Sequence, residues 1–227
     1  MMFSMCLQAL NRNFAVANTM KMQKSPYTAA LTGGGFLFDE TVRLLPLLMS
    51  ENSEALLKEE KVNNNLLLIN AECSRKKAII EIKRRFNAVD PSFWEDFKDM
   101  NDSDQVIALF FVILKTYKIC FDFHVQVTLR KWNGITKCVD KEDLMMEFNE
   151  ISAKDAFVDS WSDNTKNKIA SGYLTILRRV GMLDNENHLH ALSCGNYAYY
   201  LAKGEPWFLE ACLLQPYEIE NVKKTMI

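Results

Sequence analysis

Apolar side chains recur three and four positions apart along most of the chain, which is the spacing of one buried face of an α-helix. Glycine and proline, which interrupt helices, number only 8 and 5 among 227 residues. The clearest apolar stripe lies in residues 165–180 and consists of Ile169, Tyr173, Ile176, Leu177 and Val180. Gly181 follows at the position where a left-handed C-cap ends a helix. The pattern predicts a mainly α-helical bundle.

The first half of the chain carries further helical patterns. Residues 36–50 and 104–117 each predict a hydrophobic helix, and Asp90 with Pro91 is typical of a helix start. Ser74 is a suitable N-cap for a helix whose apolar face comprises Ala78, Ile79, Ile82 and Phe86. These helices should form the core.

Breaks in the pattern predict three parts. A loosely attached N-terminal extension is expected at 1–24, an N-terminal helical domain at 25–131 and a C-terminal winged-helix-like domain at 132–227. The boundary between the last two is placed at the sequence Trp132-Asn133-Gly134, which interrupts the helical spacing.

A short alternating stretch follows the stripe at 165–180. The sequence MLDNENHLHAL alternates apolar and polar residues on either side of Asp184–Asn187, which predicts a small β-hairpin. A helix followed by a tight hairpin is the order of a winged helix, in which the helix enters the major groove and the wing touches the backbone. The fold class is therefore predicted as a helical bundle with a winged-helix-like C-terminal part.

Charge is distributed unevenly although the whole chain carries a formal charge of only −2. Residues 139–164 contain eight acids against two lysines. Two predicted helices carry cations on the side away from their apolar stripe, where phosphates could be contacted. The candidate nucleic-acid-binding residues are Arg75, Lys76, Lys77, Lys83, Arg84 and Arg85 on the first helix, and Lys166, Lys168, Thr175, Arg178 and Arg179 on the second. A plain amphipathic helix with a solvated charged face is the alternative interpretation.

Residue patterns typical of catalysis or metal binding are not found. Gly33–Gly35 lacks the Lys-Ser/Thr element of a phosphate-binding loop, so a turn that allows close packing is favoured. His188, His190 and Cys194 offer three zinc ligands without a regularly spaced fourth, and two surface histidines on a wing are the simpler interpretation. No catalytic residue, metal site or cofactor is therefore predicted.

The cellular context is predicted from cysteines and apolar runs. The six cysteines form no C-x-x-C pair and the chain shows no signal peptide, which favours reduced thiols in a cytoplasmic protein. The longest apolar run, Val106–Leu114, has nine residues, whereas a membrane-spanning helix needs about 20. We expect no membrane association.

Three segments resemble a known family. They are YTAALTGGGFLFDET at 27–41, NNNLLLINAECSRKKAIIEIKRRF at 63–86, and the combination of Thr165, Lys168, Leu177 and Gly181–Asp184. In this order they are similar to the BrxA family, a component of bacterial BREX phage-defence systems, over residues 27–203. The resemblance implies a small helical, non-enzymatic protein likened to the antitermination factor NusB, able to bind DNA and acting beside a methyltransferase and an ATPase.

Three functions are therefore kept open. The first is a DNA-binding accessory subunit that contacts duplex phosphates with weak sequence preference. The second is an interaction scaffold that uses the basic helices and the acidic stretch to bind proteins. The third is RNA binding, which rests on the NusB analogy alone.

Overall fold

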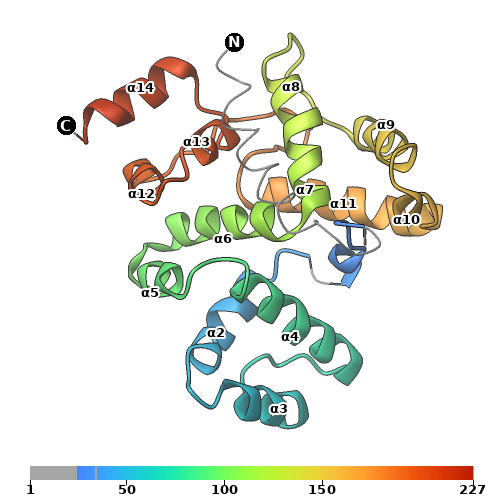
Figure 1. Cartoon of the computed structure of the whole chain (residues 1–227), viewed down its shortest axis with the longest axis vertical. Helices are drawn as coiled ribbons and strands as arrows, with labels where there is room; N and C mark the ends of the chain where they lie inside the picture. The colour runs from blue at the N-terminus through green and yellow to red at the C-terminus, as the bar shows by residue number, and fades with distance from the viewer. Residues whose placement is uncertain (1–24, 34, 227) are drawn as a thin grey trace, which may run out of the picture.

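The computed structural model describes residues 25–33 and 35–226; the expected extension at 1–24 lies outside them. The protein is mainly helical, as predicted, with α6 near the middle of the molecule (Figure 1). None of the described helices combines the length and apolar character that crossing a bilayer requires. The elements in chain order are η1 (Ala30–Gly33), α2 (Phe38–Leu48), α3 (Ser53–Asn63), α4 (Glu72–Phe86), α5 (Pro91–Asp99), α6 (Asp102–Thr116), α7 (Lys118–Phe123), η2 (His124–Thr128), α8 (Leu129–Trp132), α9 (Lys141–Ser152), α10 (Ala156–Asp159), α11 (Asp163–Arg179), α12 (Tyr197–Ala202), α13 (Trp207–Ala211) and α14 (Pro216–Lys224).

Side-chain caps fix where several helices begin. Asn101 before α6 and Ser162 before α11 each accept a backbone N–H from the first turn, which satisfies a donor that the helix itself leaves free. The prediction that Ser74 caps a helix is wrong, because α4 begins earlier, at Glu72.

The main core is built around α6. Every residue from Ile107 to Leu114 is buried, so this helix is covered on all sides. The ring of Phe123 lies 4.9 Å from that of Phe148 and 5.5 Å from that of Tyr173, measured between centroids. One core therefore continues across residues 131 and 132, and the division of the chain at that point stays a prediction.

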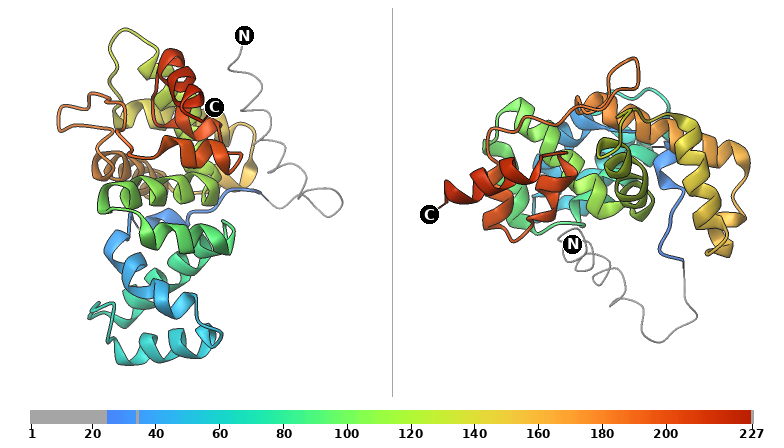
Figure 2. Two further views of the ribbon diagram at one scale, coloured as in Figure 1. Left: turned by 90° about the vertical axis from the view of Figure 1, so that its left-hand side faces the viewer. Right: turned by 90° about the horizontal axis from the view of Figure 1, so that it is seen from above.

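A second, smaller core lies between α2, α3 and α4. It comprises Leu44, Leu48, Leu57, Leu67, Ile79 and Ile82. In the left view of Figure 2 these three helices form one end of the elongated molecule. Helix α4 also contacts α6, so it connects this lobe with the main core.

Arg85 ties α4 to the turn before α2. Its side chain is completely buried, and its guanidinium donates to the carbonyl of Phe36 at 2.6 Å and to that of Gly35 at 2.7 Å. Its Nε donates to the Tyr117 hydroxyl at 3.1 Å, and that hydroxyl donates to the buried carboxylate of Glu81 at 2.9 Å. A buried cation needs such partners for its donors. The cluster therefore fixes the glycine-rich turn against α4 and α6.

Two further buried charges hold the loop between α3 and α4. Arg75 donates through Nε to the carbonyl of Lys61 at 2.8 Å and through Nη1 to that of Ile69 at 2.5 Å. Glu60, at the end of α3, accepts the N–H groups of residues 65–67 at 2.9 to 3.1 Å. The loop's backbone groups are thereby satisfied by side chains instead of by a sheet or helix.

The predicted β-hairpin wing is wrong, because the described residues contain no strand. Isolated antiparallel bridges join Leu183 to Leu189 and Cys138 to His188. The Asp184 carboxylate accepts the N–H groups of Glu186 at 2.9 Å and His188 at 2.8 Å, which makes a side-chain-stabilised turn. A side chain that takes backbone donors competes with a strand ladder, so the segment 182–190 forms a turn with single bridges.

His124 sits in the short π-helical segment η2 and is buried. Its Nε2 lies 2.9 Å from the Ala211 carbonyl, which can only accept, so Nε2 carries the proton. Its Nδ1 then accepts from the Tyr173 hydroxyl at 2.9 Å, and that hydroxyl accepts from Thr128 at 2.8 Å. Burial lowers the pKa of His124 to about 4.

Acidification should therefore destabilise the protein through His124. Between pH 6.5 and 4 the unfolded chain binds a proton at this position and the folded chain does not, so stability falls as the pH falls. From pH 7 to pH 5 we expect a loss of about 2 kcal/mol in the free energy of unfolding, measured by urea denaturation. His124→Gln should remove most of this dependence, whereas exposed His188→Gln should retain it. Equal pH profiles for the wild type and His124→Gln would contradict the prediction.

Removing the guanidinium of Arg85 should destabilise the fold. Arg85→Ala leaves the carbonyls of Phe36 and Gly35 and the hydroxyl of Tyr117 without their donor and opens a cavity, so we expect a loss of at least about 3 kcal/mol in urea denaturation. Exposed Lys77→Ala on the same helix is the control and should change stability by about 0.5 kcal/mol or less. A loss below about 1 kcal/mol for Arg85→Ala would show that the cluster is not an anchor.

Candidate nucleic-acid interface

Helix α11 presents a polar face opposite its buried stripe. Ile169, Tyr173, Ile176 and Leu177 are buried, as the spacing predicts. The exposed residues of the opposite face are Lys168, Ser171, Thr175, Arg178 and Arg179. Lys166 is not part of this face. Only 9% of its surface is exposed and its ammonium donates to the Ser152 hydroxyl at 2.9 Å, so the expected exposure of Lys166 is wrong.

The cations of this face are free of carboxylates within residues 25–33 and 35–226. No ion pair forms at Lys168, Arg178 or Arg179 there. Arg178 donates to the side-chain carbonyl of Asn187 at 2.6 Å, which orients its guanidinium beside the 184–188 turn. Spacing along the sequence gave no signal for this contact. We name these three residues the α11 basic face.

Helix α4 exposes fewer cations than the sequence suggested. The six candidates were expected on one outward surface, and this is wrong for Arg75 and Arg85, which are 6% and 0% exposed. Both use their donors on backbone carbonyls inside the protein. Neither can reach a phosphate while the fold is intact.

The other four cations of α4 differ in their pairing. Lys83 pairs with Glu54 of α3, and Arg84 lies 3.5 Å from the carboxylate of Glu81. Lys76 and Lys77 are exposed and have no ion pair within the described part of the chain. Pairing lowers the charge that Lys83 and Arg84 offer to a polyanion, so the unpaired positive charge on α4 is concentrated at Lys76 and Lys77.

The segment before α2 connects the two helices. Element η1 contacts both α4 and α11, and in Figure 1 it is the blue turn between them. The hydroxyl of Thr28 accepts from Arg84 at 3.4 Å, and the side chain of Leu31 approaches Gly172 of α11 closely. The sequence did not predict this bridge, because it depends on tertiary contacts. The two basic helices therefore belong to one connected framework.

Helices α9 and α10 form an acidic counterpart. Glu142, Glu150 and Asp159 are exposed there, beside two exposed apolar side chains, Met146 at 64% and Phe157 at 51%. Negative charge repels phosphate, so this region is unsuited to nucleic acid. It has the mixed apolar and charged character of a protein-binding surface.

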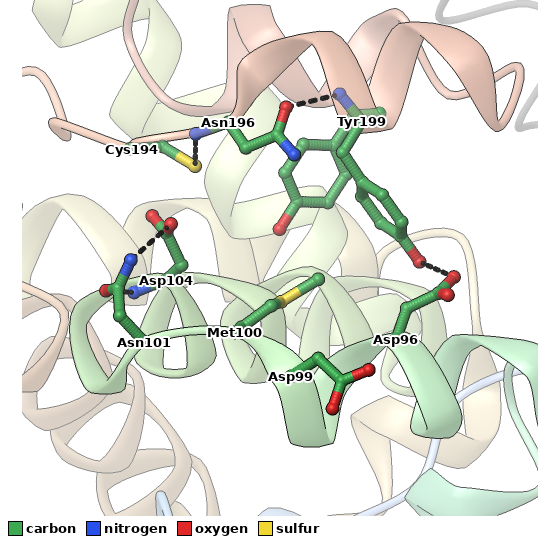
Figure 3. A pocket seen from close by; sticks show the side chains of 9 residues that line it. Asp96, Asp99, Met100, Asn101, Asp104, Cys194, Asn196 and Tyr199 are labelled. Atoms are coloured by element: carbon green, nitrogen blue, oxygen red, sulfur yellow. Dashed lines mark hydrogen bonds between the residues drawn. The ribbon is translucent and has the colours of Figure 1, made fainter.

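A polar pocket of about 320 Å³ lies between α5, the start of α6 and α12 (Figure 3). The carboxylate of Asp104 accepts from the Gly195 N–H and from the Asn101 amide, each at 2.8 Å. Burial raises the pKa of the Cys194 thiol to about 12, so this thiol remains neutral. The carboxylate of Asp104 is thus already engaged, and the Cys194 thiol is a poor nucleophile.

The two histidines near the C-terminal turn share one carboxylate. His190 lies 3.0 Å and His188 3.7 Å from Asp184. Over the described ranges no group of three or more metal-ligating side chains gathers, and Cys194 is not placed with the histidines. These imidazoles stand at the edge of the turn that carries Asn187.

Comparison with known proteins relates this chain to others in both sequence and structure. The BrxA family model matches residues 25–193. A curated protein of Bacillus cereus (strain H3081.97), named BREX protein BrxA, is 22% identical over 165 residues, which are 73% of this chain and 82% of that protein. The crystal structure of an uncharacterized protein from Magnetospirillum magneticum superposes with a TM-score of 0.69 at 20% identity, covering 83% of this chain and 98% of that one, and so shares the fold. Because the family model spans well over half of the sequence, the chain belongs to the BrxA family.

Proposed function

We propose that this protein is a non-enzymatic DNA-binding accessory subunit of a BREX phage-defence system, and that the α11 basic face contacts duplex phosphates. The role in BREX follows from the family and from the name of the Bacillus cereus relative. The other components with which it acts are, in this proposal, a methyltransferase and an ATPase.

The observation that carries the proposal is the combination of exposure and lack of pairing on α11. With a rise of about 1.5 Å per residue, Lys168 and Arg179 stand roughly 16 Å apart along the axis, and Arg178 lies between them. This is wider than the major groove, at about 12 Å, so cations at the two ends can approach separate phosphate strands. The Ser171 hydroxyl lies between them and can donate to a phosphate or a base edge, whereas the Thr175 hydroxyl donates to the Ser171 carbonyl at 2.9 Å and can accept from a base edge.

The order of the elements also supports DNA binding. In a winged helix, the helix before the wing enters the major groove. Here α11 is followed by the 184–188 turn, which holds Arg178 through Asn187. The turn stands where the alternating pattern of residues 182–192 predicted a β-hairpin. Lys76, Lys77 and Arg84 on α4 form a second, weaker contact in this proposal. Phosphate contacts carry little sequence information, so weak sequence preference follows.

A scaffold role is the second candidate, favoured by the exposed side chains of Met146 and Phe157 within the acidic region. The two roles use different surfaces and are separable. RNA binding has no structural feature of its own here, and an RNA arm in the binding experiment distinguishes it from duplex DNA binding.

Neutralising the α11 basic face should weaken DNA binding and its salt dependence. We expect each of Lys168→Ala and Arg179→Ala to reduce the slope of log K against log salt by about 1, since each neutralised phosphate contributes roughly 0.9. Fluorescence anisotropy with a 20-base-pair duplex at several salt concentrations measures this. The matched control is Lys224→Ala, an exposed lysine of α14.

Urea denaturation of each variant should show unchanged stability, since neither side chain is buried. If Lys168→Ala and Arg179→Ala bind duplex DNA with the wild-type slope, the α11 basic face is not the contact. Tighter binding to duplex RNA or to single strands than to duplex DNA would favour the RNA function instead.

A further inference from the structure

An apolar groove runs between the end of α8 and helix α14. It has a volume of about 330 Å³, and its apolar lining includes Leu129, Trp132, Leu214 and Ile219. No residue of α14 is fully buried, and the helix rests on the body through half-buried Ile219 and Val222. One side of an amphipathic helix is thus left without a full cover.

Two polar groups in this groove lack partners. The indole N–H of Trp132 is buried and has no acceptor within residues 25–33 and 35–226. Glu210 is half-buried and its carboxylate forms no hydrogen bond or ion pair there, while Lys223, the groove's cation, pairs with Glu220 at 2.7 Å. Burial raises the pKa of Glu210, which shows that desolvation outweighs the attraction of Lys223. A complementary occupant would carry an apolar stripe, a hydrogen-bond acceptor and a cation.

Residues 1–24 have this composition. Their sequence places Phe3, Leu7, Leu10 and Phe14 at the spacing i, i+4, i+7 and i+11, which defines one face of a helix. Lys21 follows seven residues after Phe14 and continues the same face. The charged residues of the segment are Arg12, Lys21 and Lys24, with no acid among them. Apolar pattern and charge sign both match the groove.

The length of the segment is sufficient to reach the groove. The hydroxyl of Tyr27, close to the start of the described chain, donates to Asp122 of α7 at 2.7 Å. From Asp122 the helical path through η2 to Trp132 is ten residues, or about 15 Å. Twenty-four residues span about 36 Å even as a helix. We propose that the groove between α8 and α14 is the docking site of residues 3–21 of the same chain, with Lys21 paired to Glu210.

Hydrogen–deuterium exchange on the full chain tests this proposal. Leu10→Asp places a charge in the apolar stripe, and we expect backbone exchange in residues 129–133 and 214–223 to become at least fivefold faster. Gln8→Glu adds the same charge on the side of the helix away from the stripe and is the matched control, with exchange unchanged. Equal exchange in the two variants overturns the proposal.

A charge exchange gives a second test that does not depend on the apolar face. Lys21→Glu and Glu210→Lys should each accelerate exchange of the groove at least threefold, and the double variant should return it to within twofold of the wild type. Absence of this rescue overturns the predicted pair. Protection of the groove that increases between 1 and 100 µM protein would identify a second copy as the occupant and would also overturn the proposal.

Discussion

Buried positive charge is the constraint on which the surface of this protein depends. A guanidinium removed from water must use its donors inside the molecule, and Arg85 does so by binding two carbonyls of the glycine-rich turn and the hydroxyl of Tyr117. Arg75 likewise holds the loop after α3. These arginines build the small lobe and its connection to α6. The positive surface is consequently narrower than the sequence suggests, and it is defined by cations that form no ion pair within the described part of the chain.

Helix α11 is divided into a buried apolar side and an exposed polar side. Its apolar side fills the main core, where Tyr173 joins the His124 network. Its other side exposes cations and hydroxyls, and the cations have no carboxylate partner among the residues that the structure describes. The helix is held rigidly from within, by the core and by η1, while Arg178 is oriented from outside by Asn187. A helix packed in this way, with Arg178 already oriented, is well suited to a polyanion, because little side-chain conformational freedom has to be lost at Arg178 on binding.

Helical class and the apolar stripe of α11 could be predicted because both depend on local spacing. The exposure of individual cations could not be predicted from their charge. Their positions relative to the apolar stripe of each helix did indicate which of them are buried. Arg75 stands four residues before Ile79, Arg85 three after Ile82 and Lys166 three before Ile169, so each continues an apolar stripe. For these residues, a position in line with the apolar stripe predicts burial of the side chain better than its charge predicts exposure. The prediction of a β-hairpin wing was wrong for another reason. The Asp184 carboxylate accepts backbone N–H groups that a strand ladder would need. The bridge formed by η1 arises only from tertiary packing.

The most direct measurement of the central claim is a hydrogen-exchange footprint of the protein with and without saturating duplex DNA. Protection should appear in peptides from 165–190, which carry the α11 basic face and the adjoining turn, and should be lost as salt is raised. Protection confined to other helices, or no protection at saturation, would contradict the assignment of DNA binding to α11.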